Sequence, residues 1–239
     1  MRLTVATYNI HACIGGDGRF EPPRIAAVLR ELNADVVALQ EVEGHRVDDV
    51  ELLHSLAAAA GLQAIAGPTL RRDTRQYGNA LLTRLPVRGV QRINLSLPRR
   101  EPRGALDVVL DWQGQRLRVV ATHLGLQPGE RRDQVRRLLA LFESGDADLC
   151  VLLGDLNEWF LWGRPLRWLH RQFTATPHRR TYPARLPLFA LDRIWVQPRT
   201  ALQHIETHRS PLARLASDHL PLKAELAVGQ HHDHPNAKA

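Results

Sequence analysis

The sequence has few of the residues that would cross-link, anchor or export a protein. Cys13 and Cys150 are the only cysteines among 239 residues, which excludes a disulfide framework and favours a reducing compartment. No apolar run reaches the roughly 20 residues of a membrane-spanning helix. The first residues also lack the apolar core of a secretory signal. We therefore expect a soluble, cytoplasmic protein.

Lysine is also scarce, since Lys223 and Lys238 are the only two and arginine supplies the remaining basic charge. The net charge is nevertheless +7 and the isoelectric point is near 10.3. A charge of this sign favours a polyanionic partner, such as nucleic acid, a phosphorylated metabolite or an anionic lipid surface. Heavy use of arginine, alanine and leucine also follows from coding bias, so the charge by itself selects no partner.

The sequence does contain many short strand patterns and a few amphipathic helices. We expect helices at 22–32, 49–60 and 129–142, and strands at 2–8, 35–39, 62–66, 78–83, 87–95, 105–112, 117–122, 149–153, 192–196 and 219–228. The turn at Gln113 and Gly114 predicts a hairpin. This order predicts a mixed α/β fold in which helices pack outside two stacked sheets.

We expect a single domain over residues 1–228, because no linker-like composition interrupts it. Residues 229–239 form a histidine-rich tail, with His231, His232 and His234, that we expect to be disordered. Deletion of residues 230–239 is therefore expected to leave activity intact.

The stretch from Asp148 to Glu158 organises the chain. Its apolar residues 149–153 predict a strand buried on both faces, and the strand leads directly into Gly154, Asp155 and Asn157. If the strand alternation continues, Asp155 and Asn157 point to the same side. A carboxylate and an amide placed together suit a metal and a phosphate, although the same residues are also common in ordinary turns.

The same arrangement recurs along the chain, because polar side chains repeatedly follow the end of an apolar strand. These residues are Asn9, Glu41, Asn79, His123, Asp155, Asn157, Asp192, Asp218 and His219. If the strand ends meet, four carboxylates lie close together and repel one another, and a divalent cation relieves that repulsion. Oxygen ligands without a cysteine cluster favour Mg²⁺, with Mn²⁺ as a substitute.

His123 and His219 add groups that can carry a proton near neutral pH, and Arg103 offers a bidentate clamp for a phosphate oxygen. This equipment suits attack by water on a phosphate ester. Taken singly, each residue also has an ordinary structural interpretation: Asn9 and Asn79 as turn residues, and Arg103 as a surface arginine. The repetition along the whole chain favours the site.

The ordered motifs resemble those of the endonuclease/exonuclease/phosphatase superfamily, whose members are similar to deoxyribonuclease I. The match spans roughly residues 2–228 and is carried by Thr7-Tyr8-Asn9-Ile10, Leu39-Gln40-Glu41-Val42, Gly78-Asn79-Ala80-Leu81-Leu82, Thr122-His123-Leu124, Gly154-Asp155-Leu156-Asn157, Leu191-Asp192-Arg193-Ile194 and Ser217-Asp218-His219-Leu220-Pro221. The resemblance implies a four-layer α/β/β/α sandwich with a site at one end of the paired sheets.

It also implies roles for single residues. Asn9 and Glu41 would bind Mg²⁺, and Asp218 would complete that metal site or form a second one. Asp155 and Asn157 would position the nucleophilic water and the scissile phosphate.

The remaining roles concern proton transfer and substrate. Asp192 would orient His219 as the general base, and His123 would contact the phosphate or protonate the leaving oxygen. Asn79 and Arg103 are expected to bind substrate. The Thr-His-Leu motif is similar to the deoxyribonuclease I, sphingomyelinase and inositol-phosphatase branches.

Three functions remain open, and we expect a monomer without an obligate protein partner in each. The first is a nuclease, favoured by the charge and by the arginines of the presumed rim: Arg71, Arg72, Arg75, Arg99, Arg100 and Arg103. The second is a phosphodiesterase acting on a phospholipid head group, with an interfacial wedge at 159–162. The alternative for that segment is a helix with its aromatics facing the core. The third is a catalytically silent binding domain.

Overall fold

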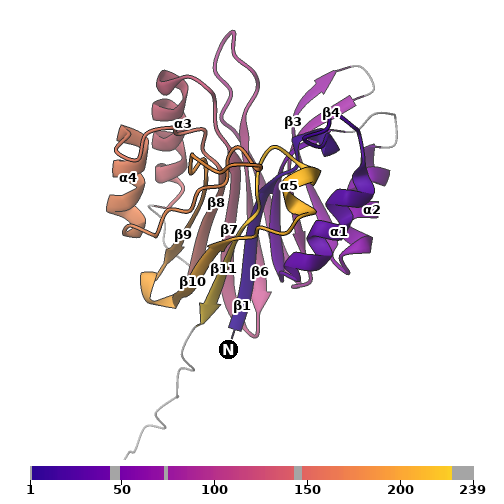
Figure 1. Cartoon of the computed structure of the whole chain (residues 1–239). Helices are drawn as coiled ribbons and strands as arrows, with labels where there is room; N and C mark the ends of the chain where they lie inside the picture. The colour runs from indigo at the N-terminus through magenta and orange to yellow at the C-terminus, as the bar shows by residue number, and fades with distance from the viewer. Residues whose placement is uncertain (1, 44–48, 73–74, 143–146, 228–239) are drawn as a thin grey trace, which may run out of the picture.

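The structure is a computed structural model that describes residues 2–43, 49–72, 75–142 and 147–227. The expected histidine-rich tail lies outside these residues. Figure 1 shows two central sheets with helices on both outer faces.

The eleven strands among the described residues divide between the two sheets. The first sheet has the order β10 (Leu202–Thr207), β11 (Leu222–Ala227), β1 (Arg2–Asn9), β2 (Val36–Glu43), β4 (Arg75–Thr83) and β3 (Gln63–Arg72). The second has the order β5 (Val87–Asn94), β6 (Gly104–Trp112), β7 (Gln115–His123), β8 (Leu149–Asp155) and β9 (Asp192–Gln197). The predicted hairpin at residues 113–114 joins β6 to β7, which confirms it.

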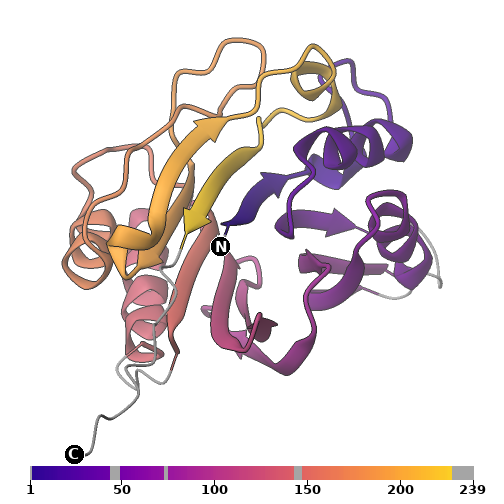
Figure 2. The same ribbon diagram turned by 90° about the horizontal axis from the view of Figure 1, so that it is seen from below.

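Helices cover the outer face of each sheet. The first sheet carries α1 (Pro22–Leu32), α2 (Asp49–Ala59) and α5 (Ala213–Ala216), and the second carries α3 (Pro128–Ala140) and α4 (Arg164–Phe173). Two 3₁₀ turns, η1 (His11–Cys13) and η2 (Arg199–Ala201), complete the elements. Figure 2 shows the layers from below. The predicted four-layer α/β/β/α sandwich is thus confirmed. In the described parts of the chain, no helix is both long and apolar enough to cross a bilayer.

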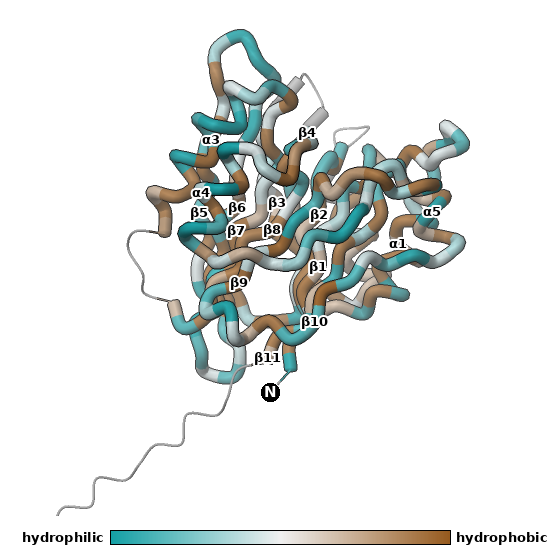
Figure 3. Tube along the Cα trace, turned by 60° about the vertical axis from the view of Figure 1, so that its left-hand side comes forward, coloured by the Kyte–Doolittle hydropathy of each residue, from teal (hydrophilic) through white to brown (hydrophobic). Residues whose placement is uncertain are grey.

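Side-chain alternation along the strands explains the layers, because buried strands supply apolar groups to both faces. In β1, Val5 packs between the sheets, whereas Tyr8 packs against α1. In β8, Val151 faces the other sheet, whereas Leu152 packs against α3 and α4. Three apolar clusters result, one at each boundary between layers. Figure 3 accordingly shows the central strands rich in hydrophobic residues.

Two parallel strand pairs direct their ends to one edge of the molecule. β1 and β2 are parallel and joined by α1, with Asn9 opposite Gln40. β7 and β8 are parallel and joined by α3, with His123 opposite Asp155. The antiparallel strand β9 begins at the same edge, where Asp192 lies opposite Asp155. The chain therefore delivers polar residues from distant segments to a single rim.

The prediction for the last strand is wrong at its start. β11 begins at Leu222, so His219 lies in a loop before the strand. Pro221 has no N–H for a ladder, and the N–H of Leu220 donates to the Thr181 carbonyl, which ties this loop to another one. The sequence pattern also missed β10, whose exposed and buried residues do not alternate regularly.

The alternative interpretation of residues 159–162, a helix with its aromatics facing the core, is wrong. Helix α4 begins only at Arg164, directly after Gly163. Its second residue is Pro165, and proline suits the first turn of a helix. The aromatic residues before it are exposed rather than turned to the core, with Trp162 at 72% and Phe160 at 56% of full exposure.

Candidate active site

Asp155 is the last residue of β8. The preceding Gly154 allows β8 to approach β7 closely at this point. Gly154 has φ +146°, and a Cβ added there would lie 1.9 Å from the Thr122 carbonyl oxygen. Only glycine fits such a close approach of two backbones. β8 can therefore lie beside β7 up to its end, which places Asp155 opposite His123.

Asn157 reaches the site through a turn rather than through strand alternation, so the predicted alternation is wrong. It lies beyond β8 with φ 51°, and its N–H donates to Asp155 Oδ1 at 2.8 Å. Its amide nitrogen donates to the Leu124 carbonyl at 2.9 Å and lies 3.0 Å from His123 Nε2. Asp155 Oδ2 lies 3.6 Å from the same nitrogen. Asp155 and Asn157 thus converge on His123.

Asn9 connects the two sheets. Its amide nitrogen donates to Glu41 Oε1 at 3.0 Å in the first sheet and to Asp155 Oδ2 at 3.1 Å in the second. Glu41 reaches this position because β2 continues past the predicted end at residue 39 through a register shift, in which Glu41 adopts φ 56°. A bulge of this kind re-aims a side chain at the edge of a sheet.

His219 is oriented by a buried carboxylate. Asp192 Oδ2 accepts hydrogen bonds from Thr181 Oγ1 at 2.5 Å and from His219 Nδ1 at 2.8 Å. The other imidazole nitrogen, Nε2, lies 3.7 Å from Asp155 Oδ2. Ser217 Oγ accepts from the His219 N–H at 3.2 Å and donates to the Asn9 carbonyl at 2.8 Å, which fixes the loop to β1.

Arg103 is buried against His123 and does not face solvent as a surface arginine would. Its Nη1 donates to His123 Nδ1 at 3.0 Å, and its Nη2 donates to Glu101 Oε2 at 3.1 Å. Burial and the adjacent guanidinium lower the pKa of His123 to about 3, although Asp155 opposes the shift. This lowered pKa contradicts the expectation that His123 carries a proton near neutral pH and favours a neutral imidazole.

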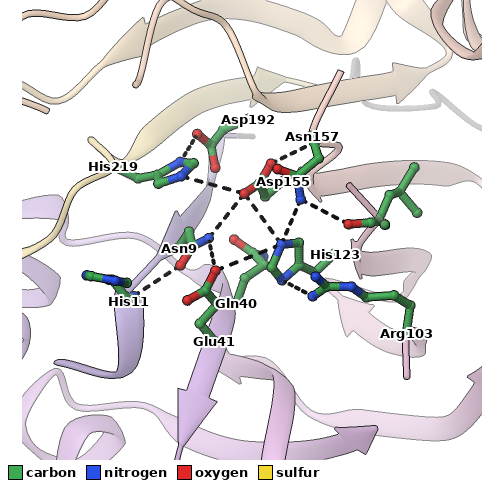
Figure 4. A network of polar contacts seen from close by, with 12 residues as sticks. Asn9, His11, Gln40, Glu41, Arg103, His123, Asp155, Asn157, Asp192 and His219 are labelled. Atoms are coloured by element: carbon green, nitrogen blue, oxygen red, sulfur yellow. Dashed lines mark hydrogen bonds and ion pairs between the residues drawn. The ribbon is translucent and has the colours of Figure 1, made fainter. Parts of the chain in front are cut away.

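Like charges dominate the electrostatics of the cluster in Figure 4. Burial raises the pKa of Glu41, and the carboxylates of Asp155 and Asp218 raise it further, against the hydrogen bond from Asn9. Burial by itself would lower the pKa of His219, but Asp192 and Asp155 raise it to about 10. The protein thus holds the Glu41 carboxylate where its ionisation is costly, which is a setting that a cation would stabilise.

Two predicted residues have no direct hydrogen bond to Asp155, His123 or the Asp192–His219 pair among the described residues. Asp218 lies at the rim, where its side chain is 36% exposed and its Oδ1 is 3.9 Å from His11 Nδ1. Asn79 lies within β4 rather than in a turn, and its amide donates to the Gly104 carbonyl at 3.0 Å. Asn79 therefore supports the backbone of β6, and no contact of its side chain with the cluster is seen among the described residues.

The donor atoms fit a hard divalent cation. Carboxylate oxygens of Glu41 and Asp155 meet at the amide nitrogen of Asn9, and Asp218 lies close enough to raise the pKa of Glu41. The amide oxygen of Asn9 accepts from the His11 N–H at 3.0 Å, so Asn9 would ligate a cation through this oxygen after its amide turns. Ligand atoms of Asp155, Asp192 and His219 also lie within 4.8 Å of one another. Because Asp192 Oδ2 already accepts two hydrogen bonds, however, Asp192 suits the orientation of His219 better than the ligation of a metal.

Four residues of the site escaped the sequence analysis: His11, Thr181, Tyr182 and Ser217. Ser217 stands within the Ser-Asp-His motif, which signals it. The ring of Tyr182 lies 4.8 Å from that of His219, and nothing in the surrounding sequence indicates that contact. His11 sits on η1, where His11, Ala12 and Cys13 all have positive φ. Cys13 is buried and burial raises its pKa to about 12, so it is no nucleophile.

The structure tests only part of the expected arginine rim. Arg103 is buried, and Arg100 lies 3.9 Å from Glu130. Arg99 is exposed. The side chains of Arg71, Arg72 and Arg75 lie outside the described residues.

Known proteins share this fold and sequence pattern. The chain is 32% identical over 243 residues to the uncharacterized protein YbhP of Escherichia coli K12, covering 93% of this chain and 95% of the relative. A Bacteroides vulgatus endonuclease/exonuclease/phosphatase has a TM-score of 0.78 at 18% identity, covering 96% of this chain and 100% of that one. Danio rerio TDP2, complexed with a single-strand DNA product, has a TM-score of 0.70 at 18% identity, covering 95% and 99%. Since residues 6–219 match the Endonuclease/Exonuclease/phosphatase family, the chain belongs to that family.

Proposed function

We propose that the protein is a Mg²⁺-dependent phosphodiesterase that hydrolyses its substrate by direct attack of water. One observation carries the proposal: the buried Asp192–His219 pair points its free imidazole nitrogen toward Asp155, which Asn9 joins to Glu41. An oriented base and a group of oxygen ligands thus lie side by side. Membership of the family supports the same reaction class.

The proton path follows from the hydrogen bonds. Asp192 accepts from His219 Nδ1, so Nε2 carries the lone pair when the ring is neutral. A cation beside Asp155 would offset one of the carboxylates that raise the pKa of His219 to about 10, which favours the neutral ring that the reaction needs. Nε2 then takes a proton from water while the water oxygen bonds to phosphorus and the bond to the leaving oxygen breaks in line. Asp155 lies 3.7 Å from Nε2, where it orients the water. Asp192 stabilises the imidazolium that forms.

Other residues serve the phosphate. The lowered pKa favours a neutral His123, and we assign the hydrogen to Nε2 because Nδ1 accepts from Arg103. Nε2–H would then donate to a phosphate oxygen, while the nearby amide nitrogen of Asn157 donates to the Leu124 carbonyl. Arg103 therefore acts through His123 rather than as the expected direct clamp. Asn9, Glu41 and Asp218 would hold the cation, which polarises the phosphoryl group and neutralises its charge.

Two substrate classes each have specific support. A nucleic acid is supported by the net charge of +7 and by the structural similarity to TDP2 in complex with single-strand DNA. A phospholipid head group is favoured by the exposed aromatic and leucine side chains at 159–162 and 186–189, among which Trp159 packs against Tyr182, the neighbour of His219. Both classes present the same phosphodiester to the site.

The test is hydrolysis of a small soluble diester, bis(p-nitrophenyl) phosphate, by the purified protein. We expect turnover with Mg²⁺ or Mn²⁺, loss of turnover with a chelator, and recovery when the cation is restored. Asp155→Ala removes the activity, whereas the exposed His204→Ala retains it. A wild-type protein that hydrolyses no phosphodiester with either cation, while remaining folded, would leave only a binding function.

A further inference from the structure

Two loops expose an unusual number of large apolar side chains. The first comprises residues 159–162 and the second residues 186–189. Together they form what we call the apolar rim: Trp159, Phe160, Leu161, Trp162, Leu186, Leu188 and Phe189. Trp162 is 72% exposed and Leu186 is 68% exposed. Scattered apolar residues are normal on a surface, but a contiguous group marks an interaction site.

Ring contacts show that the two loops form one surface. The ring centroids of Trp159 and Phe189 are 4.8 Å apart, and those of Phe160 and Trp162 are 5.6 Å apart. The second loop is held by backbone hydrogen bonds from Leu188 and Phe189 to the Tyr182 carbonyl, both at 2.8 Å. The apolar rim is therefore a fixed feature rather than two unrelated loops.

The apolar rim is continuous with the candidate active site. Trp159 packs edge-on against Tyr182 at 5.8 Å, and Tyr182 lies 4.8 Å from the imidazole of His219. Trp159 also follows Asn157 by only two residues. Whatever covers the apolar rim thus lies next to the group proposed to activate water.

The chain segment that carries the apolar rim has charged residues of a single sign. Residues 159–191 contain six arginines and no aspartate or glutamate. All six arginine side chains are exposed: Arg164, Arg167, Arg171, Arg179, Arg180 and Arg185. An apolar surface flanked by cations complements a partner with an apolar interior and an anionic surface. A second copy of this chain, with its own charge of +7, does not offer that complement.

We propose that the apolar rim docks the protein on an anionic phospholipid bilayer. Aromatic side chains enter the head-group region, and the exposed arginines bind lipid phosphates. The three leucines distinguish this partner from single-stranded nucleic acid, because a leucine has no aromatic face on which a base can stack.

Docking on a bilayer also indicates the substrate class of the enzyme. This part of the inference rests on the proposed phosphodiesterase function. A phospholipid in the bilayer presents its phosphodiester at the depth of the head groups, next to apolar chains. In the protein, His219 likewise lies next to the apolar rim, because Trp159 contacts Tyr182 and Tyr182 contacts His219. The structure therefore assigns a membrane phospholipid, rather than a freely diffusing diester, as the physiological substrate.

Binding is tested first without turnover. The full chain is sedimented with vesicles of equal phosphatidylglycerol and phosphatidylcholine, and with vesicles of phosphatidylcholine alone. We expect stronger binding to the anionic vesicles, weakened by added salt, and quenching of tryptophan fluorescence by brominated lipid. No binding to anionic vesicles would overturn the proposal, whether or not the protein hydrolyses soluble diesters.

The double variant Trp162→Gln and Leu186→Gln tests the surface itself. We expect its affinity for anionic vesicles to fall about tenfold or more, because two apolar anchors are lost. The matched control is Val90→Gln, an exposed apolar residue on β5 at the opposite end of the second sheet from β9. Equal affinities of the double variant and the wild type, with superimposable melting curves, would overturn the proposal.

Hydrolysis rates then distinguish a lipid partner from a nucleic-acid partner. We compare hydrolysis of phosphatidylglycerol vesicles with hydrolysis of bis(p-nitrophenyl) phosphate as a ratio. The double variant should lower this ratio about tenfold, as its vesicle affinity falls. If instead it lowers binding and cleavage of a single-stranded oligonucleotide while vesicle binding is unchanged, the apolar rim serves nucleic acid and the proposal fails. If the wild type hydrolyses neither substrate but still binds vesicles, the proposed function is refuted and the docking is not.

Discussion

At the scale of single residues, the site depends on how each polar group is partnered. Asp192 is fully buried, yet its Oδ2 receives hydrogen bonds from Thr181 and His219, which compensate for the burial of a charge. Its Oδ1 has no partner among the described residues. Asp155 lies near both histidines, but His123 is buried beside the cation Arg103, whereas His219 pairs with the carboxylate of Asp192. Two histidines in one site thus have opposite pKa shifts.

This pairing predicts the kinetics of three variants. We expect His219→Ala to lower kcat by about 10³-fold, and Asp192→Asn by about 10²-fold because it loses the orienting charge. The double variant should be no slower than His219→Ala, since the two residues act as one unit. Steady-state rates on a soluble diester measure all three, with His204→Ala as an exposed control. Losses that simply multiply would show that the residues act independently.

At the scale of elements, β8 carries the site because two parallel backbones approach unusually closely. Gly154 lies opposite Thr122 in the β7–β8 pairing, where its missing Cβ leaves room for a carbonyl oxygen. The bulge in β2 has a comparable function for Glu41. Irregular backbone at the ends of regular strands thus points the functional side chains at one another.

We expect Gly154→Ala to lower the free energy of unfolding by more than about 3 kcal/mol, because a methyl group would overlap the Thr122 carbonyl. Chemical denaturation measures the change. The matched control is Gly129→Ala in α3, where an added Cβ meets nothing within 4 Å. That substitution should leave stability unchanged or raise it by up to about 1 kcal/mol. A Gly154→Ala protein as stable as the wild type would contradict the close approach.

At the scale of the whole molecule, the site lies across the boundary between the two sheets. Glu41 belongs to the first sheet and Asp155 to the second, and Asn9 bonds to both. A cation bound here would join the halves of the sandwich, so its binding energy would add to the stability of the entire fold.

We therefore expect Mg²⁺ at about 100 times its dissociation constant to raise the free energy of unfolding by about 2.7 kcal/mol. Glu41→Gln should remove most of this gain. In metal-free protein the same substitution should raise the melting temperature, because burial and two neighbouring carboxylates disfavour the Glu41 charge. The exposed Glu206→Gln on β10 is the matched control. Equal Mg²⁺-dependent gains in wild type and Glu41→Gln would contradict this metal site.

The sequence by itself determined the layers and most of the site. Apolar strands with periodic helices between them leave two packed sheets as the way to bury both faces of each strand. Polar motifs at strand ends identified Asn9, Glu41 and Asp155, because parallel strands send their ends to one edge, and the Ser-Asp-His motif identified His219.

Only the tertiary structure decided which groups touch. The lowered pKa of His123 depends on its burial and on Arg103, which is 20 residues away in the chain. The bond from Thr181 to Asp192 and the path from Trp159 through Tyr182 to His219 join loops that no local pattern relates. Periodicity reports which face of an element is buried, whereas contacts between loops depend on where several elements end in space.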